Sequence, residues 1–325
     1  MTQPELSTIV VAWRAADDVT RLVAAWPRDP RFELLIVDQD GDLRLGLEQG
    51  FRRTAEGIPP ENIRLLEPGR NLGFAGGSNF GARAARSERL FFLNPDACPA
   101  EGALAEISRA FDSWPQADGL VPRLEGFDGA PQARWQLRRL PTPLALLAHA
   151  WFWNPGGGPE APPVAGTPIE QPAAAALALR RSVFEAVGGF DDRFYPAWFE
   201  DVDLARRLAD RGHRLLYLPA ALCRHRQGSS VGELGYGAFL TAYDRNLCRY
   251  LDKHHGHSWS LAFRALAGPA ALARLLLLPL RRPARAGTRA QAARALLAVA
   301  HGSLSGWAQP SRESREPRES RESSA

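Results

Sequence analysis

LFFLNPDA, residues Leu90–Ala97, is the segment that decides how this chain of 325 residues folds. Its apolar run stops abruptly at Asn94-Pro95-Asp96, which is typical of a short buried strand. Because Pro95 cannot continue a sheet ladder, Asn94 and Asp96 should lie at the carboxyl edge of the strand. Ligands of open α/β sheets bind outside that edge, where a carboxylate and a carboxamide can hold a divalent cation or a polar ligand. Taken alone, the segment is better explained by a strand followed by an ordinary Asn-Pro-Asp turn.

Strands and helices alternate before this segment. TIVVAW (Thr8–Trp13), FELLIV (Phe32–Val37) and Ile63–Leu66 read as strands, Asp17–Trp26 as an amphipathic helix, and the stretch to Gly57 as helix-like. This β-α-β-α-β order predicts a doubly wound sheet. After it we expect helices at Glu101–Trp114 and Arg180–Val187 and strands at Gly119–Pro122, Ala173–Leu179 and Arg214–Leu218.

A glycine-rich run, GRNLGFAGGSNFG (Gly69–Gly81), precedes a predicted helix from Ala82 to Arg89. Glycine and asparagine permit positive φ and let backbone N–H groups approach a ligand, as phosphate-binding loops require. The spacing is neither GxGxxG nor GxxxxGK[ST], and the run follows a third strand rather than the first. A dinucleotide fingerprint and a P-loop are therefore excluded. A ligand-binding loop and a plain helix entry both remain open.

The second informative stretch is GGFDDRFYPAWFEDVDLARR, residues Gly188–Arg207. Glu200, Asp201 and Asp203 fall where an amphipathic helix begins, and acidic residues there can simply complement the helix dipole. The neighbouring aromatics, with a further strand behind them, favour a sugar-binding cleft instead. His225 follows that strand between two arginines. It fits a surface residue, a metal ligand or a phosphate contact.

The composition is that of an ordinary globular protein, with 45% apolar and 23% charged residues and a net charge of +4. Lys253 is the single lysine; arginine richness on this scale can follow from genome composition, so it does not argue for a nucleic-acid partner. The cysteines, Cys98, Cys223 and Cys248, are far apart, which favours a reducing cytosol and excludes a disulfide framework. We expect no signal peptide, and the apolar run Pro269–Leu280 is too short to span a bilayer.

The C-terminal part reads as helical from Gly232. Leu261–Leu304 combines Leu/Ala faces with seven arginines, so it either lies on an anionic membrane surface or packs on the core with a solvated arginine face. Gln309–Ala325 repeats Ser-Arg-Glu without an apolar anchor and should be disordered.

Three stretches together resemble the family 2 glycosyltransferases of GT-A fold, especially their rhamnosyltransferase-like branch. They are RNLGFAGGSNFG (Arg70–Gly81), FFLNPDA (Phe91–Ala97) and GGFDDRFYPAWFEDVDLARRLADRG (Gly188–Gly212), and the resemblance extends over Thr8–Ser230. It implies an α/β fold with a mostly parallel, twisted, Rossmann-like sheet flanked by helices. The glycosyltransferase domain would comprise residues 1–230, a C-terminal helical extension 231–308 and the disordered tail 309–325.

The resemblance also implies a nucleotide site. Val11, Trp13 and Asp38 would line the base pocket, with Asp38 accepting from the pyrimidine N3–H. Asn71, Gly73 and Asn79 would shape the nucleotide and pyrophosphate side of the donor site. The stretch VDQDGD departs from the family's usual Asp-Asn-x-Ser run, so ribose contacts are not carried over.

Metal and acceptor residues are implied in the same way. Asn94-Pro95-Asp96 stands where the family has its DxD motif, so Asp96 would ligate Mg²⁺ or Mn²⁺ with His225, and Asn94 replaces the first aspartate beside the nucleotide. Asp201 would be the catalytic base. On the acceptor and sugar side the resemblance places Trp198, Glu200 and Asp191.

These roles predict an inverting, metal-dependent transfer of a sugar, such as L-rhamnose from its dTDP donor, to a cell-surface glycan or polyprenyl-linked saccharide. A cation stabilises the leaving diphosphate and one carboxylate deprotonates the acceptor, so no enzymic nucleophile is needed. The enzyme would be cytoplasmic, with peripheral contact at the inner membrane face. Two alternatives remain: a nucleotidyltransferase, disfavoured because no triphosphate loop opens the chain, and a non-catalytic nucleotide-sugar or glycan-binding protein.

Overall fold

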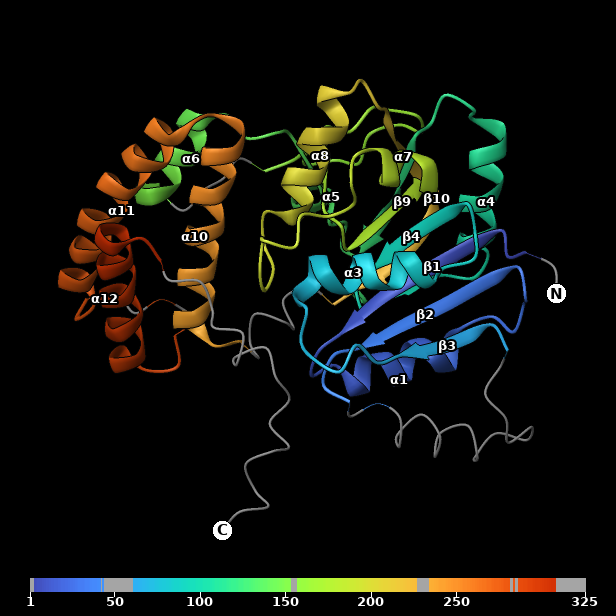
Figure 1. The fold of residues 1–325 in the computed structure, drawn as a ribbon, viewed down its shortest axis with the longest axis horizontal. Coiled ribbons are helices and arrows are strands. Elements are labelled where there is room, and N and C mark those ends of the chain that lie inside the picture. The colour runs from blue at the N-terminus through green and yellow to red at the C-terminus, as the bar shows by residue number, and fades with distance from the viewer. Residues whose placement is uncertain are drawn as a thin grey trace, which may run out of the picture.

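The structure is a computed structural model that describes residues 3–41, 43, 61–152, 157–226, 234–280, 283 and 286–307. An eight-stranded sheet with the order β3-β2-β1-β4-β9-β6-β10-β5 forms its centre (Figure 1). The strands of this sheet are β1 (Leu6–Ala12), β2 (Phe32–Asp38), β3 (Ile63–Leu66), β4 (Arg89–Leu93), β5 (Ala97–Pro99), β6 (Gly119–Glu125), β9 (Ala176–Arg180) and β10 (Leu215–His225). Two short strands, β7 (Leu137–Arg138) and β8 (Gln171–Pro172), form a separate ladder.

The helices connect and cover these strands. They are α1 (Ala16–Ala25), α3 (Gly73–Ala84), α4 (Ala103–Ser113), α5 (Ala133–Gln136), α6 (Pro143–Phe152), α7 (Arg181–Ala186), α8 (Glu200–Asp210), α10 (Tyr236–His254), α11 (His257–Leu277) and α12 (Arg289–Ser305). The predicted helix-like stretch between the second and third strands lies almost wholly outside the described residues.

The sheet is mixed. β3, β2, β1 and β4 run parallel, as the alternation of strands and helices predicts, and β6 and β10 are parallel to each other. Between these two groups β9 pairs antiparallel with both β4 and β6, and β5 pairs antiparallel with the end of β10. The predicted α/β class, with a sheet flanked by helices, is confirmed, and the parallel pairing is concentrated in the N-terminal half.

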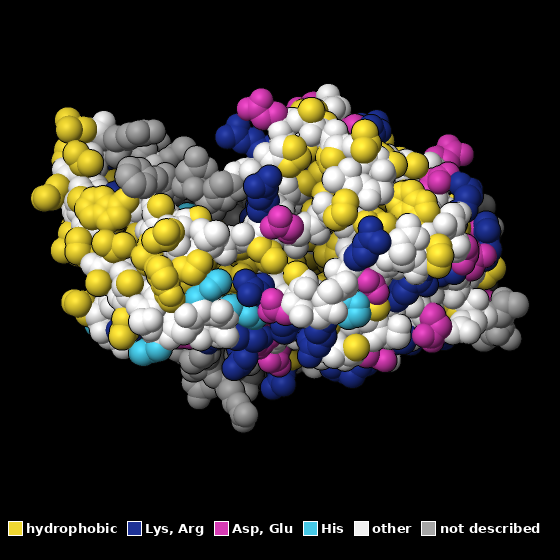
Figure 2. All heavy atoms as spheres, turned by 90° about the horizontal axis from the view of Figure 1, so that it is seen from above, with side chains coloured by type: hydrophobic (Ala, Val, Ile, Leu, Met, Phe, Trp, Pro, Cys, Tyr) yellow, Lys and Arg dark blue, Asp and Glu magenta, His cyan; other side chains and the backbone are white. Residues whose placement is uncertain are grey.

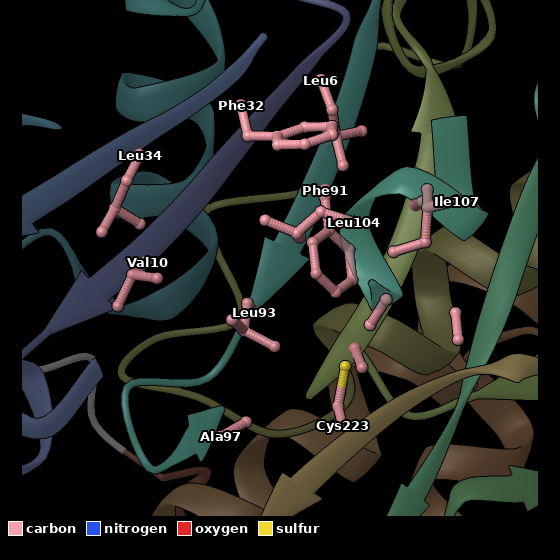
Figure 3. Close-up of a cluster of buried hydrophobic side chains, with 14 of the residues drawn as sticks. Leu6, Val10, Phe32, Leu34, Phe91, Leu93, Ala97, Leu104, Ile107 and Cys223 are labelled. Carbon is pink, nitrogen blue, oxygen red and sulfur yellow. The ribbon is translucent and has the colours of Figure 1, made fainter. Parts of the chain in front are cut away.

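Alternation along β4 divides the core into two layers. Phe91 and Leu93 point toward α1 and α4, where Leu104 and Ile107 join Leu6, Val10, Phe32 and Leu34 (Figure 3). Leu90 and Phe92 point to the opposite face, which α3, α7 and α8 cover. Because both faces of the strand are buried, its sequence reads as a continuous apolar run rather than an alternating one.

The prediction of a glycine-rich loop up to residue 81 and a helix from 82 to 89 is wrong. The helix α3 itself contains the glycines, and β4 begins at Arg89. A Cβ on Gly77 would come within 2.7 Å of Val11 Cγ1, and one on Gly81 within 2.5 Å of Ile9 Cγ2. The glycines therefore serve close packing of α3 on β1, a use that the helix propensity of glycine alone does not suggest.

The C-terminal helices α10, α11 and α12 pack together beside the sheet, and α6 joins them from within the N-terminal part of the chain (Figure 1). Arg274 of α11 donates to the carbonyl oxygens of Ala150 and Trp151 in α6. The predicted domain boundary at residue 230 and the predicted disordered tail fall outside the described residues.

Among the described residues α11 alone is long and apolar enough to cross a membrane, with a mean hydropathy of 1.4 in its most apolar window. One such helix is weak evidence for a span, because core helices pass the same test. Its inner face packs against neighbouring helices through Phe263, Ala267 and Ala271.

Candidate active site

The ladder between β10 and β5 brings Asp96 and His225 together. It places His225 opposite Ala97, the residue after Asp96. Asp96 and His225 are thereby neighbours in space, although they are 129 positions apart in sequence. The imidazole Nε2 lies 3.3 Å from Asp96 Oδ1. His225 is 2% exposed and Asp96 6%, so the interpretation of His225 as a surface histidine is wrong.

Two neighbours orient the His225 ring. Gln132 Nε2 donates to the His225 carbonyl at 2.9 Å, and its Oε1 lies 2.8 Å from His225 Nδ1. The Gln132 Nε2 group can only donate, and it donates to the carbonyl oxygen. The Gln132 Oε1 atom therefore faces His225 Nδ1 and accepts a hydrogen bond from its N–H group. The ring of Trp135 stacks on the imidazole at 5.2 Å between centroids. In the neutral ring, this arrangement leaves the lone pair of His225 Nε2 facing Asp96.

These residues fit a divalent cation. A carboxylate oxygen and an imidazole lone pair that face each other without a proton between them repel, and a cation held by both removes that repulsion. Asn94 Nδ2 lies 3.5 Å from His225 Nε2, so the carboxamide borders the same spot. No group of three or more His, Cys, Asp or Glu side chains suitable for a metal occurs within the described part of the chain. The protein would thus supply two strong ligands here, which leaves room for ligands from a substrate.

Asp201 and Glu200 lie at the first turn of α8, but in different surroundings. Asp201 Oδ2 accepts from Arg138 Nη2 at 3.3 Å and Gln171 Nε2 at 3.4 Å, which come from the paired strands β7 and β8. Glu200 is 7% exposed. Burial, followed by the negative charge of Asp201, raises the pKa of Glu200 well above its ordinary value. The two carboxyl groups therefore lie in different environments, and that of Glu200 disfavours its charged form.

The loop that leads into α8 is strained and held from the C-terminal region. Trp198 and Phe199 have φ of +74° and +71°, a conformation that bulky residues seldom adopt. Asn246 of α10 donates through Nδ2 to the carbonyl oxygens of Ala197 at 2.8 Å and Trp198 at 3.1 Å. The Trp198 ring also packs edge-on against Phe239 of α10 at 4.8 Å. The C-terminal helix α10 thus positions the loop that directly precedes the predicted base, Asp201.

A charged network also connects α8 to α10. The wholly buried Asp203 contacts Arg207, Lys253 and His254 at 2.6–2.8 Å. Burial opposes its ionisation, but His254, Arg207 and Lys253 outweigh that effect and lower the pKa of Asp203. Lys253 reaches Asp191 as well, at 2.8 Å. Asp191 therefore lies in this network, and its predicted place on the sugar side stays a prediction.

The residues predicted for the nucleotide base lie at the ends of β1 and β2. Val11 is buried against Gly77, and the half-buried Trp13 is covered by the Arg14 guanidinium at 4.8 Å. The Asp38 carboxylate accepts from the backbone N–H groups of residues 40, 41 and 43 at 3.0–3.2 Å. Asp38 therefore organises the loop after β2, and its contact with a base stays a prediction.

Asn71 lies just before α3, Gly73 begins the helix, and Asn79 lies in its middle. Asn71 Oδ1 accepts from the Gly73 N–H at 2.8 Å, and a Cβ on Gly73 would lie 2.7 Å from the Pro196 carbonyl oxygen. Asn79 pairs with both backbone polar groups of Phe190, at 2.8 and 2.9 Å. The glycine-rich and the acidic-aromatic stretches are thus neighbours, and Asn79 holds the second in place.

Sequence reasoning missed the residues that support both parts of the site. Gln132 and Trp135 hold His225, and Arg138 and Gln171 hold Asp201. Three of these four lie within seven consecutive residues, so the segment α5–β7 connects the Asp96–His225 pair to Asp201. This irregular stretch has no periodicity that could have signalled this role.

Residues 7–188 match the family described as Glycosyl transferase family 2, which is more than half of the chain. The chain belongs to glycosyl transferase family 2. Among curated relatives of this glycosyltransferase, the N-acetylglucosaminyl-diphospho-decaprenol L-rhamnosyltransferase of Mycobacterium tuberculosis is 30% identical over 233 residues, covering 65% of this chain and 74% of that protein. The pre-mycofactocin glycosyltransferase of the same organism is 32% identical over 168 residues, which is 50% of this chain and 32% of that one.

Solved structures agree on the fold. The mannosyltransferase PcManGT from Pyrobaculum calidifontis, in complex with GDP-Man and Mn²⁺, is 21% identical with a TM-score of 0.50, covering 94% of this chain and 88% of its own. GalNAc-T7 with UDP, GalNAc and Mn²⁺ is 17% identical with a TM-score of 0.51, covering 76% and 47%. Both are GT-A glycosyltransferases, so the fold expected from the sequence motifs is confirmed.

Proposed function

We propose that this glycosyltransferase transfers L-rhamnose from a dTDP donor to a polyprenyl-linked saccharide, with inversion and with a divalent cation. The observation that carries the proposal is the buried Asp96–His225 pair at the carboxyl end of β4. Its donor set suits Mn²⁺ as well as Mg²⁺, since a nitrogen ligand accompanies oxygen ligands. The curated rhamnosyltransferase of M. tuberculosis supports the sugar and the acceptor class, and the Mn²⁺ in two GT-A structures supports the metal.

Asp96 and His225 would hold the cation, which when bound acts as a Lewis acid on the diphosphate leaving group. Asn94 stands where a DxD motif has its first aspartate. The Asn94-Pro95-Asp96 segment therefore brings one negative charge to the cation, whereas a DxD motif brings two. Gln132 and Trp135 keep the His225 ring in the ligating orientation.

Asp201 would act as general base. As the acceptor hydroxyl oxygen forms its bond to the anomeric carbon, Asp201 takes the hydroxyl proton, and the bond from that carbon to the diphosphate oxygen breaks. One displacement on one face inverts the configuration. Arg138 and Gln171 fix the orientation of the carboxylate, while burial disfavours a second negative charge on Glu200 next to it.

Release of nucleoside diphosphate from a panel of dTDP-rhamnose, UDP-GlcNAc and GDP-mannose tests this function, with a decaprenyl-diphosphate-linked GlcNAc acceptor. We expect turnover with dTDP-rhamnose in Mn²⁺ or Mg²⁺ and none after chelation. Turnover of another donor would refute the assignment of rhamnose. Turnover that survives chelation would refute the role of Asp96 and His225. Binding of dTDP-rhamnose without any turnover would indicate a non-catalytic protein of this fold.

A further inference from the structure

The outer face of α11 is an uninterrupted apolar surface. Its exposed positions recur every three or four residues, so they form one stripe along the helix. We call this the α11 stripe: Leu261, Ala265, Pro269, Leu272, Leu276 and, in the turn that follows the helix, Leu280. Leu276 and Leu280 are 81% and 85% exposed. A surface helix of a globular protein normally presents polar residues on this side.

Neighbouring helices also expose large apolar side chains. Leu144 and Trp151 of α6 and Leu297 and Leu304 of α12 are also exposed, and both helices pack on α11. Figure 2 shows hydrophobic side chains gathered over this end of the molecule, while charged side chains concentrate over the sheet. Apolar surface this extensive marks an interaction site rather than the scattered exposure of an ordinary monomer.

The charge of this region identifies the occupant. Residues 257–307 contain seven arginines and no Asp or Glu. Arg264 and Arg274 donate to backbone carbonyl oxygens of adjacent helices, which keeps them off the stripe, while Arg289 and Arg294 are exposed on α12. An apolar helix face in a region whose charges are all positive complements a bilayer with anionic headgroups.

We propose that the α11 stripe lies in the interface of an anionic membrane, parallel to its plane. This deepens the proposed function, on which it rests, because a polyprenyl-linked acceptor is presented at a membrane surface. It also gives a geometry to the membrane contact expected from the sequence: the leucines of the stripe enter the interface, and the arginines of the region face the headgroups. The inner face of α11 stays packed on α6, α10 and α12, so the helix does not span.

Vesicle flotation of the full chain, without donor or acceptor, tests the proposal. The vesicles are phosphatidylcholine alone or an equimolar mixture with phosphatidylglycerol. The wild-type chain should float with the mixed vesicles, bind neutral ones more weakly, and be released by alkaline carbonate. Leu276→Glu should weaken partitioning about ten- to a hundredfold, the effect of withdrawing one leucine from an apolar environment. Leu280→Glu is a second variant with the same expectation.

Val164→Glu is the matched control, because Val164 is 79% exposed on the sheet-containing part of the molecule, and it should bind like the wild type. The proposal fails if the wild-type chain does not bind mixed vesicles or if both stripe variants bind as well as the control. Resistance to carbonate would refute it in favour of a spanning helix. If the wild-type chain is a dimer that does not bind vesicles, and Leu276→Glu is a monomer, the stripe contacts a second copy of the chain and the proposal is refuted. Turnover of a water-soluble acceptor analogue should be the same in Leu276→Glu as in the wild type. This measurement distinguishes a loss of membrane binding from a failure of the proposed function.

Discussion

Replacing Gln132 by leucine should weaken binding of Mn²⁺ without removing either predicted ligand. Gln132 makes two hydrogen bonds to His225, at 2.8 Å to Nδ1 and at 2.9 Å to the carbonyl oxygen. At about 0.5–1.5 kcal/mol for each bond, the two bonds together favour the observed orientation of His225 by about 1–3 kcal/mol, and the variant loses this free energy. This corresponds to roughly a ten- to hundredfold weaker affinity, the range in which supporting residues of metal sites act. The Trp135 stack remains and limits the loss.

The assay is titration of the protein with Mn²⁺, followed by the electron paramagnetic resonance signal of the free ion. Gln132→Glu is the matched control, because its carboxylate still accepts from Nδ1 but no longer donates to the carbonyl oxygen. It should retain most of the affinity, and His225→Ala should lose more than Gln132→Leu. If folded Gln132→Leu binds Mn²⁺ as tightly as the wild type, Gln132 does not set the state of the imidazole, and the argument for a preorganised metal ligand is wrong.

Three further predictions concern the supports of the site and the fold. Asn246→Leu leaves the carbonyl oxygens of Ala197 and Trp198 without their donor, so the free energy of unfolding should fall by about 1–3 kcal/mol and turnover should fall with it. Chemical denaturation and steady-state kinetics check this. An unchanged free energy of unfolding and unchanged turnover would show that the strained loop keeps its conformation without Asn246. Burial raises the pKa of Asp244 to about 7, so the stability it contributes is complete below its ordinary pKa near 4 and is lost as pH rises from there through 7. The stability of Asp244→Asn relative to the wild type should therefore increase by about 3 kcal/mol between pH 5 and pH 9, and a pH-independent difference would contradict the burial effect. Gly81→Ala brings a methyl group within 2.5 Å of Ile9 and should lower stability by about 1–3 kcal/mol, whereas a thermal melt like that of the wild type would mean that α3 can move away from the sheet.

Local patterns in the sequence predicted the strands well. β1, β2, β3 and β4 coincide with apolar runs, and the helix with the acidic first turn begins at Glu200 as expected. The error in α3 has a physical cause: glycines that allow a helix to approach a sheet look the same in sequence as glycines that free a loop. Only the packing against Ile9 and Val11 distinguishes the two.

Long-range pairing explains what the sequence could and could not predict of the site. The family motifs named Asp96 and His225 separately, but their contact depends on β5 pairing with the end of β10. Gln132 carries no charge and lies in an irregular stretch, so no pattern marks it. The same holds for Asn246, whose importance comes from the strained residues Trp198 and Phe199 that it supports across the molecule.

The most direct test of the central claim compares turnover and ligand binding in Asp201→Asn. Because a positioned base contributes about 10²–10⁴-fold, nucleoside diphosphate release with acceptor should fall by that factor. Affinities for Mn²⁺ and for the nucleoside diphosphate should stay those of the wild type, since Asp96 and His225 are untouched. If Asp201→Asn turns over like the wild type while Glu200→Gln is inactive, Glu200 is the base, and the division of roles between the two carboxyl groups proposed for this site is wrong.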